Sequence, residues 1–166
     1  MYKAFYKSPI GVLEIISDTK AILEIEFVRD DSKTIPDELG KYTPAVIKQC
    51  IKELEEYFAG TRKKFDVAYK LDGTDFQIRV WQELEKIPFG VTITYSEQAQ
   101  NLGDIKAIRA VGTANGKNKI AIIVPCHRVK GMDGSLVGYA GGIEKKKFLL
   151  LHEQENSDAN EKGLLF

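Results

Sequence analysis

A chain of 166 residues, of which 43% are hydrophobic and 29% are charged, is long enough for one ordinary domain or two small ones with an apolar core. Its formal net charge of zero argues against a protein that binds nucleic acid through bulk positive charge, although residues 76–153 carry 11 Lys/Arg against 7 Asp/Glu. No stretch approaches the roughly 18 uninterrupted apolar residues of a membrane span, and no apolar leader opens the sequence. We therefore expect a cytoplasmic protein without membrane contact.

The first 70 residues predict a small sheet covered by one helix. Alternating apolar residues predict a three-stranded meander over the first 28 residues. Apolar residues at helical spacing predict a helix at about 44–59, in which Cys50 is a small buried side chain. A further strand is expected at Phe65–Tyr69, and Leu71–Thr74 has the composition of a junction to a second domain.

The next part of the chain predicts mainly helices. A helix from Asp75 ends at Pro88–Gly90. The T-x-x-E spacing of Thr94 and Glu97 is that of a capping box, which opens a short helix, and a second short helix is expected at about 105–114. Two short helices joined by a tight glycine turn are a helix-turn-helix candidate, although many antiparallel helix pairs share this pattern.

The last third predicts a strand, a loop and a helix. Ile120–Val124 is continuously apolar and β-branched, which predicts a short strand, buried on both faces, that leads to Cys126. Glycines crowd residues 131–142, where the backbone must bend tightly or approach a ligand. A last helix is expected at 143–153. The side chains expected to face inward from it are Phe148, Leu149 and Leu151.

These elements predict an α+β (α/β) fold in three parts. Residues 1–72 would form a small N-terminal domain of β-sheet plus helix, and residues 73–154 a mostly helical C-terminal domain with the helix-turn-helix. Residues 155–166 would form a polar, flexible tail.

Cys126 is the candidate nucleophile. His127 and Arg128 follow it directly, and an adjacent imidazole and guanidinium would stabilise a thiolate that burial alone disfavours. The other histidine, His152, precedes Glu153, a carboxylate able to orient an imidazole. From spacing alone, the alternative is a buried structural cysteine beside an ordinary histidine.

The segment Ile123–Val129, IVPCHRV, resembles the active-site signature of the O6-alkylguanine-DNA alkyltransferases. Other segments share the order and spacing of that family. They are Phe76–Trp81, Ile87–Gly90, Thr94–Tyr95, Arg109–Gly112, Ala114–Asn118, Gly138–Gly142 and Leu150–Glu153. The resemblance is strong over residues 75–153 and looser over the first 70, chiefly at Glu56–Gly60.

The resemblance implies a role for each site residue. Cys126 would accept the alkyl group, His127 would take the thiol proton through a water, and Glu153 would orient His127. Tyr95 would donate to N3 of the purine, and Arg109 would fill the space left by a flipped nucleotide. The further residues implied in DNA binding are Thr94, Ala110 and Asn118, and those implied in the guanine pocket are Val129, Tyr139, Ala140 and Gly141.

The implied function is irreversible repair of O6-alkylguanine, and of O4-alkylthymine, in double-stranded DNA that is approached from the minor groove. One monomer would react once, without a cofactor. Because residues 1–75 contain no histidine and only Cys50, no metal is expected. Lys119 stands where family members commonly have proline, which predicts a more mobile loop and leaves the tolerance of bulky alkyl groups open.

Two other classes of protein compete with this interpretation. A non-catalytic lesion-binding relative would lack the nucleophile, whereas Cys126 is present. A thiol hydrolase could use Cys126, His127 and Glu153 on a small molecule or peptide. That interpretation explains neither Arg109 within a helix-turn-helix nor the position of Tyr95.

Overall fold

The computed structural model of the chain describes residues 1–30, 34–36 and 38–158, and the chain divides into two compact units. Unit 1 comprises Met1–Leu71 together with Lys119–Ala121, and unit 2 comprises Asp72–Asn118 and the residues from Ile122 onward. The predicted tail lies largely outside the described residues. Each unit has its own core and is described by itself.

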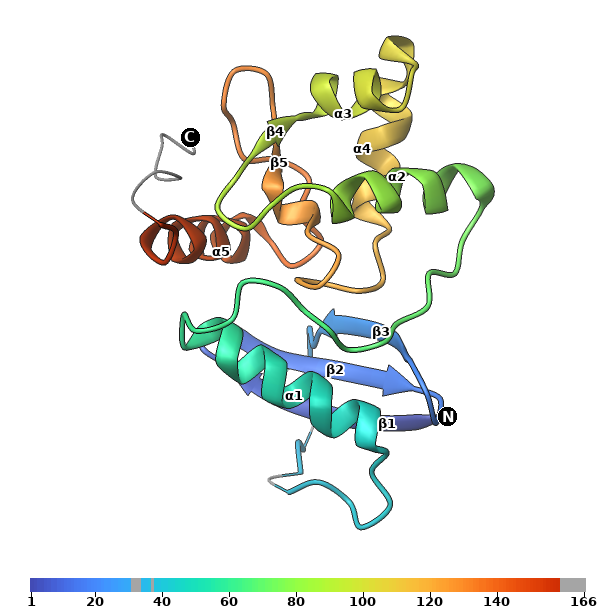
Figure 1. Ribbon diagram of the computed structural model, residues 1–166, viewed down its shortest axis with the longest axis vertical. Helices are drawn as coiled ribbons and strands as arrows, with labels where there is room; N and C mark the ends of the chain where they lie inside the picture. The colour runs from blue at the N-terminus through green and yellow to red at the C-terminus, as the bar shows by residue number, and fades with distance from the viewer. Residues whose placement is uncertain (31–33, 37, 159–166) are drawn as a thin grey trace. The chain divides into compact units, whose positions relative to one another are not determined.

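Unit 1 is an antiparallel sheet with one helix against a face (Figure 1). Strands β1 (Tyr2–Ser8), β2 (Gly11–Ser17) and β3 (Ile22–Phe27) pair in the order β1-β2-β3, which confirms the predicted meander. Helix α1 (Ala45–Phe58) packs against all three strands and confirms the predicted helix.

The core of unit 1 follows from the two periodicities of its sequence. Leu13 and Ile15 alternate along β2, Ile47 and Cys50 recur along α1, and all four are fully buried. Burial, and then the charge of Glu53, raise the pKa of the Cys50 thiol to about 12. Cys50 is therefore a protonated, inert thiol at neutral pH.

The strand predicted at Phe65–Tyr69 is wrong, because only its last residue makes a β-bridge, parallel to Ile22. The backbone amides of Asp66 and Val67 donate to Oε2 of the buried Glu53, each at 3.0 Å. A side-chain carboxylate thus satisfies donors that a strand would offer to its neighbour.

Unit 2 is mostly helical (Figure 1). Its elements in chain order are α2 (Asp75–Glu85), β4 (Ile93–Thr94), α3 (Tyr95–Asn101), the 3-10 turn η1 (Ile105–Ala107), α4 (Ile108–Gly116), the 3-10 turn η2 (Cys126–Arg128), β5 (Val129–Lys130) and α5 (Ile143–Glu155). The two short strands pair in parallel. The fold class predicted from the sequence, a small sheet-and-helix part followed by a mostly helical part, is confirmed.

Helices α3 and α4 form the predicted helix pair, and hydrogen bonds inside unit 2 hold them in place. Thr94 caps α3, since its Oγ1 accepts from the Glu97 amide at 3.1 Å. Trp81 of α2 donates from Nε1 to the Ala114 carbonyl at 2.9 Å. The buried side-chain amides of Gln98 in α3 and Asn115 in α4 exchange hydrogen bonds of 3.0 and 2.7 Å. This network orients the two helices relative to each other.

The strand predicted at Ile120–Val124 is wrong, although the segment is buried as expected. Its first residue makes a single parallel bridge to Ile25 of β3, and the chain then turns with Ile122 at a φ of 71°. A β-branched residue rarely adopts that backbone conformation, which persists here because Ile122 is packed at 1% exposure. The strand forms after Cys126 instead, as β5. The carbonyl of Lys119, where a mobile loop is predicted, accepts a hydrogen bond from the Ile25 amide at 2.8 Å.

The inward face of α5 also differs from the prediction. Leu149 is buried as expected, but Phe148 and Leu151 are each 37% exposed. The buried stripe consists of Lys146, Leu149, Leu150 and Glu153, at spacings of three, four and seven residues. Two of these are charged, so a pattern of apolar residues alone could not find the stripe.

Within residues 1–30, 34–36 and 38–158, no helix combines the length and apolar character needed to cross a bilayer. The same residues contain no cluster of three or more His, Cys, Asp or Glu side chains placed to hold a metal ion.

Candidate active site

Cys126 opens the tight turn η2 between the buried segment and β5. Its amide donates to the Val124 carbonyl at 2.9 Å, and the Arg128 amide donates to the Pro125 carbonyl at 3.0 Å. Cys126 is half-buried, whereas His127 and Arg128 are buried. Of the three residues in this turn, only the cysteine is partly accessible to a substrate.

A buried hydrogen-bond network joins His127, Arg128 and Glu153. His127 Nε2 lies 2.8 Å from Glu153 Oε1, and Arg128 donates from Nη2 to Oε1 and from Nε to Oε2, both at 2.9 Å. The Gly90 amide also donates to Oε2 at 3.2 Å, and Arg128 Nη1 donates to the Ile87 carbonyl at 2.6 Å. Each carboxylate oxygen therefore has at least two donors, which hold it in one orientation.

The network sets the protonation states of its members. Burial would favour the neutral acid, but the hydrogen bonds of His127 and Arg128, the charge of Arg128 and, at low pH, the charge of the protonated His127 outweigh it and lower the pKa of Glu153. Burial also lowers the pKa of His127, against the opposing effect of Glu153. An ionised carboxylate beside a neutral imidazole requires that His127 Nε2 carry the proton, so Nδ1 is an acceptor. Nδ1 is buried without a partner among the described residues, and it is the base available to this site.

The thiol of Cys126 accepts a hydrogen bond from an amide and is within electrostatic range of an ammonium group. Burial raises the pKa of this thiol, while a hydrogen bond from Asn118 Nδ2 to Sγ, at 3.4 Å, and the charge of Lys146 oppose the rise. Lys146 is itself buried, which lowers its pKa to about 8, so it is mostly protonated at neutral pH. The thiol thus needs a base to ionise, and the thiolate, once formed, is stabilised by Asn118 and Lys146.

Tyr95 meets the glycine-rich loop through its hydroxyl group, which donates to the Val137 carbonyl at 3.0 Å. The same carbonyl accepts from Lys146 Nζ at 3.0 Å, and that ammonium lies 5.8 Å from the centre of the Tyr95 ring. Gly138 has a φ of 71°, and a Cβ there would lie 3.4 Å from the Tyr95 hydroxyl oxygen. Burial, and then the charge of Cys126, raise the pKa of Tyr95. Tyr95 and Cys126 are therefore electrostatically coupled.

The predicted pocket residues lie on β5 and on the loop that follows it. Val129 is fully buried in β5. The Tyr139 hydroxyl is buried with no partner among the described residues, and burial, followed by the charges of Cys126 and Glu153, raises the pKa of Tyr139 well above its usual value. Ala140 is exposed and Gly141 is half-buried in the adjacent turn. Tyr139 therefore has an unused donor near the reacting groups.

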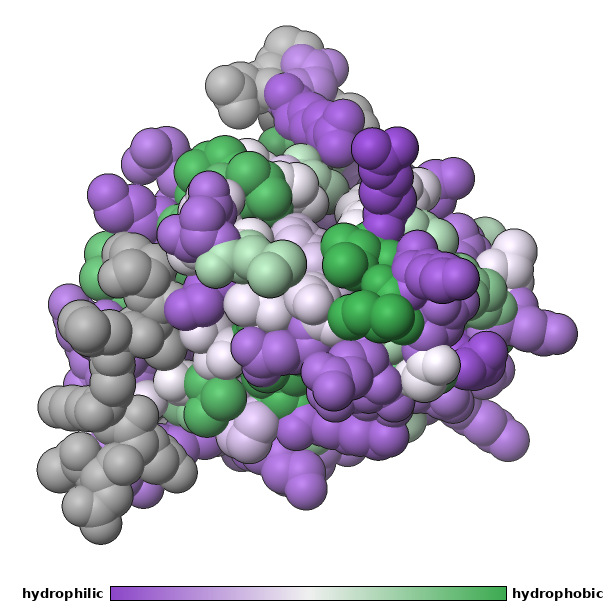
Figure 2. Space-filling model, turned by 90° about the horizontal axis from the view of Figure 1, so that it is seen from above, coloured by the Kyte–Doolittle hydropathy of each residue, from purple (hydrophilic) through white to green (hydrophobic). Residues whose placement is uncertain are grey.

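The residues predicted to bind DNA separate into two sets. Arg109 and Ala110 are exposed at the start of α4, next to the exposed apolar side chains of Ile105 and Ile108. Figure 2 shows the molecule from above, where hydrophobic patches stand among mostly hydrophilic residues. By contrast, Thr94 is engaged as the cap of α3, and Asn118 faces the thiol. Asn118 therefore contacts the sulfur of Cys126, which spacing along the chain does not reveal.

Two further residues of the site were missed by the sequence analysis. The sequence presents Arg128 as a source of charge for the thiol, whereas in the structure its guanidinium forms two parallel hydrogen bonds with Glu153. Lys146 was not singled out, although it lies seven residues before Glu153 and so on the same face of α5. That spacing is the signal that could have found it once Glu153 was assigned to the interior.

Comparison with known proteins assigns both units. Residues 75–155 match the DNA-binding domain of 6-O-methylguanine DNA methyltransferase, and residues 1–71 match its ribonuclease-like domain. The methylated-DNA–protein-cysteine methyltransferase of Methanosarcina acetivorans is 46% identical over 151 residues, which cover 90% of this chain and 96% of that protein. The enzyme of Mycobacterium tuberculosis H37Rv is 43% identical over 158 residues, with 92% of each chain covered. The crystal structure of Mycobacterium tuberculosis OGT in complex with DNA is similar, with a TM-score of 0.83, 42% identity and coverage of 96% of this chain and 97% of that one. The chain therefore belongs to the 6-O-methylguanine DNA methyltransferase family.

Proposed function

We propose that this protein repairs O6-methylguanine in DNA by transferring the methyl group to its own Cys126, the activity named for its relatives. The observation that carries the proposal is a partly accessible thiol next to a neutral histidine in the chain. The Glu153 carboxylate holds this histidine, and Arg128 keeps the carboxylate ionised. This arrangement supplies a nucleophile, a base and an orienting group.

The proposed reaction is a single displacement. The thiol proton passes through a water to His127, the sulfur attacks the alkyl carbon, an S–C bond forms and the C–O6 bond breaks. The electron pair of the broken bond stays on guanine, which accepts a proton at N3 from Tyr95 after that hydroxyl turns from the Val137 carbonyl. The product is a thioether without an electrophilic carbonyl carbon, so water cannot restore the thiol. O4-alkylthymine presents the same alkyl–oxygen bond and would react in the same way.

The proposed partner is double-stranded DNA that carries the lesion, bound by a monomer. O6 lies within stacked duplex, so the nucleotide must rotate out at a cost of a few kcal/mol. The exposed Arg109 at the start of α4 supports a role in filling the gap from the minor groove. The modest positive charge of residues 76–153 suits backbone contacts that are independent of sequence.

Incubation with a duplex containing O6-methylguanine should add the mass of one methylene group to the protein, and repaired DNA should stop at one equivalent. Peptide mapping should place the added mass on Cys126. Cys50 is an internal control, because its buried thiol has a pKa of about 12 and should remain unmodified. Absence of an adduct would leave only lesion binding, and turnover beyond one equivalent would favour a hydrolase.

His127→Ala should slow the reaction with free O6-benzylguanine by about 100-fold or more at neutral pH, the usual contribution of a general base. The rate should recover as pH rises, because the thiol then ionises without help, and burial holds its pKa above its usual value. The measurement is the inactivation rate as a function of pH.

His152→Ala is the matched control for this prediction. His152 is half-buried, stacks on Phe148 with ring centres 6.2 Å apart, and has its Nδ1 3.4 Å from Asn156 Nδ2. Its removal should leave the pH profile unchanged. If His127→Ala also keeps the unaltered profile, His127 is not the base.

Arg109→Ala should slow repair in duplex DNA by ~100-fold, the equivalent of a few kcal/mol lost from the flipped state, and should spare free O6-benzylguanine. The free base needs no extrusion from a stack. Lys106→Ala is the control, since it removes one exposed positive charge from the adjacent turn η1. Both variants should reduce the salt dependence of binding, but only Arg109→Ala should slow the reaction at saturating DNA. If Arg109→Ala slows the reactions with duplex DNA and with the free base equally, Arg109 supports the guanine pocket instead.

A further inference from the structure

The turn η1 and the first residue of α4 expose two large aliphatic side chains. Ile105 is 52% exposed and Ile108 is 37% exposed. The residues of α4 that face the core are Val111, Ala114 and Asn115, so neither isoleucine belongs to that buried side. One exposed aliphatic residue is ordinary on a protein surface. Two that are three residues apart in a 3-10 turn lie one above the other and form a continuous apolar surface.

This apolar surface adjoins Arg109, the residue proposed to fill the gap in the duplex. Arg109 is exposed directly after Ile108, and Lys106 is exposed in η1. Asp104 is the only acidic residue in the segment 102–118, and its Oδ1 accepts a hydrogen bond from the Lys106 amide at 3.0 Å. The surface therefore combines aliphatic side chains with a net positive charge.

The same side of α4 leads toward the reacting groups. Gly112 follows Ile108 by four residues, about one helical turn, and a Cβ at Gly112 would lie 3.9 Å from two ring carbons of Tyr95. The Tyr95 hydroxyl in turn donates to the Val137 carbonyl of the glycine-rich loop. A ligand that lies along this side of α4 therefore runs from the two isoleucines to the side chain proposed to protonate guanine.

The minor groove of a DNA duplex has the chemistry that matches this surface. Phosphates line both rims of the groove and attract cations such as Lys106 and Arg109. Proteins that bind in this groove frequently insert aliphatic side chains between neighbouring base pairs, which partly unstacks the base step and kinks the duplex. Unstacking also supplies part of the energy that rotation of a base out of the helix requires.

We propose that Ile105 and Ile108 form a wedge that enters the minor groove and opens the base step next to the nucleotide that Arg109 replaces. This inference rests on the proposed function, because it takes duplex DNA as the partner. The wedge adds apolar contacts, which salt does not weaken, to the phosphate contacts of the cations. It also lowers the cost of base rotation.

Affinity for duplex DNA, measured by fluorescence anisotropy over a range of salt concentrations, separates the wedge from the charges. Ile108→Ala should weaken binding by about 10-fold at every salt concentration and leave the salt dependence unchanged, because it removes buried aliphatic surface. Ile108→Lys should also weaken binding at high salt, although its added charge would strengthen a purely electrostatic contact. With 2-aminopurine placed beside the lesion, both variants should reduce the fluorescence increase that reports unstacking.

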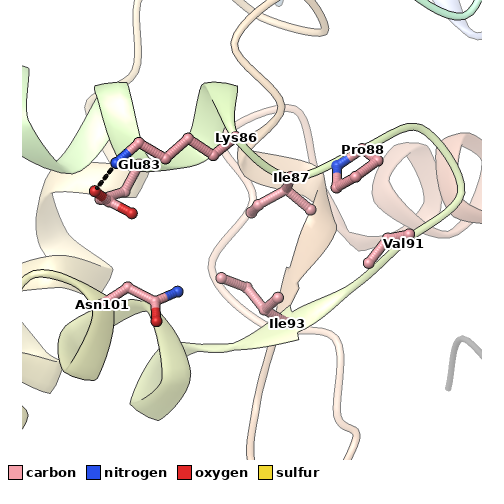
Figure 3. A pocket seen from close by; sticks show the side chains of 7 residues that line it. All are labelled: Glu83, Lys86, Ile87, Pro88, Val91, Ile93 and Asn101. Atoms are coloured by element: carbon pink, nitrogen blue, oxygen red, sulfur yellow. Dashed lines mark hydrogen bonds and ion pairs between the residues drawn. The ribbon is translucent and has the colours of Figure 1, made fainter.

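Val91→Ala is the matched control, since Val91 is also an aliphatic residue of unit 2 and is also 37% exposed. Val91 lines an open hollow together with residues of α2, β4 and α3 (Figure 3). None of the described residues that line this hollow belongs to η1 or α4. Val91→Ala should leave both the affinity and the fluorescence unchanged. Thermal unfolding of each variant checks that the fold is retained.

Affinities of both Ile108 variants that equal that of Val91→Ala would overturn the inference, and so would an Ile108→Lys protein that binds more tightly at every salt concentration. A dimer that forms without DNA and that Ile108→Lys disrupts would assign the surface to a second copy instead. Methyl transfer to the unaltered protein tests the proposed function separately. An adduct together with unaffected Ile108 variants defeats only the wedge, and weakened binding without any adduct defeats only the proposed function.

Discussion

Replacing Cys126 by serine should abolish alkyl transfer completely while DNA affinity stays close to that of the unaltered protein. A serine hydroxyl is far less acidic than a thiol, and its oxygen attacks an alkyl carbon much more weakly than a thiolate sulfur does. The helix pair that carries Arg109 is held separately, by the Trp81–Ala114 and Gln98–Asn115 hydrogen bonds. Intact-protein mass reports the transfer, and fluorescence anisotropy with a duplex containing O6-methylguanine reports the affinity.

Cys50→Ala is the matched cysteine control. Cys50 is fully buried in unit 1, and its replacement should preserve both transfer and binding. A Cys126→Ser protein that is folded but no longer binds DNA would show that the cysteine supports the DNA-binding surface, which contradicts the separation of binding from chemistry.

Arg128→Met should lower the free energy of unfolding at neutral pH by about 3–5 kcal/mol, the cost of leaving a buried carboxylate without its cation. For a chain of this size that corresponds to a fall in Tm of ~10 °C. Glu153 would lose both hydrogen bonds of the guanidinium. The methionine side chain is similar in size to that of arginine, so the substitution mainly removes the charge and changes the packing less.

The pH dependence separates this electrostatic effect from a packing defect. In the unaltered protein the pKa of Glu153 is lowered, so its contribution to stability is present above the unfolded pKa of about 4.3 and is lost as pH falls through the folded pKa. In Arg128→Met, the pKa of Glu153 should be higher than in the unaltered protein, because only His127 then opposes the effect of burial, and protonation relieves the destabilisation at a higher pH. The stability gap between the two proteins should therefore narrow below about pH 4.

A second substitution checks the same coupling. Adding Glu153→Gln to Arg128→Met removes the unpaired charge, so the double variant should be more stable than the sum of the two single effects predicts. Denaturant unfolding at several pH values measures both effects. A gap that is constant with pH, together with additive effects, would mean that Arg128 contributes packing alone.

Local patterns predicted much of the fold. The alternation in β1 to β3 and the helical spacing of Ile47, Cys50 and Leu54 each report which side of an element is apolar. Such patterns fail for the buried face of α5, which includes charged residues, and at two segments where another interaction determines the backbone. At Asp66 and Val67 that interaction is with the Glu53 carboxylate, which accepts the hydrogen bonds that a neighbouring strand would otherwise accept. At Ile122 it is packing, which stabilises a turn that β-branched residues ordinarily avoid.

The sequence by itself determined the family of this protein, through a resemblance that the full-length comparisons confirm, and it brought a cysteine, a histidine and an arginine together in one candidate segment. The resemblance implied that Glu153 orients His127, but the sequence could not assign the other partners, because a hydrogen bond between residues far apart in the chain leaves no periodic trace. Only the tertiary structure showed that Arg128 forms two hydrogen bonds with Glu153, that Asn118 donates to the thiol and that Lys146 is buried with its charge acting on that thiol. A hydrophobicity pattern predicts that charged residues lie on the surface. Lys146 and Glu153 are nevertheless buried, because folding gives each of them a hydrogen-bonding or oppositely charged partner.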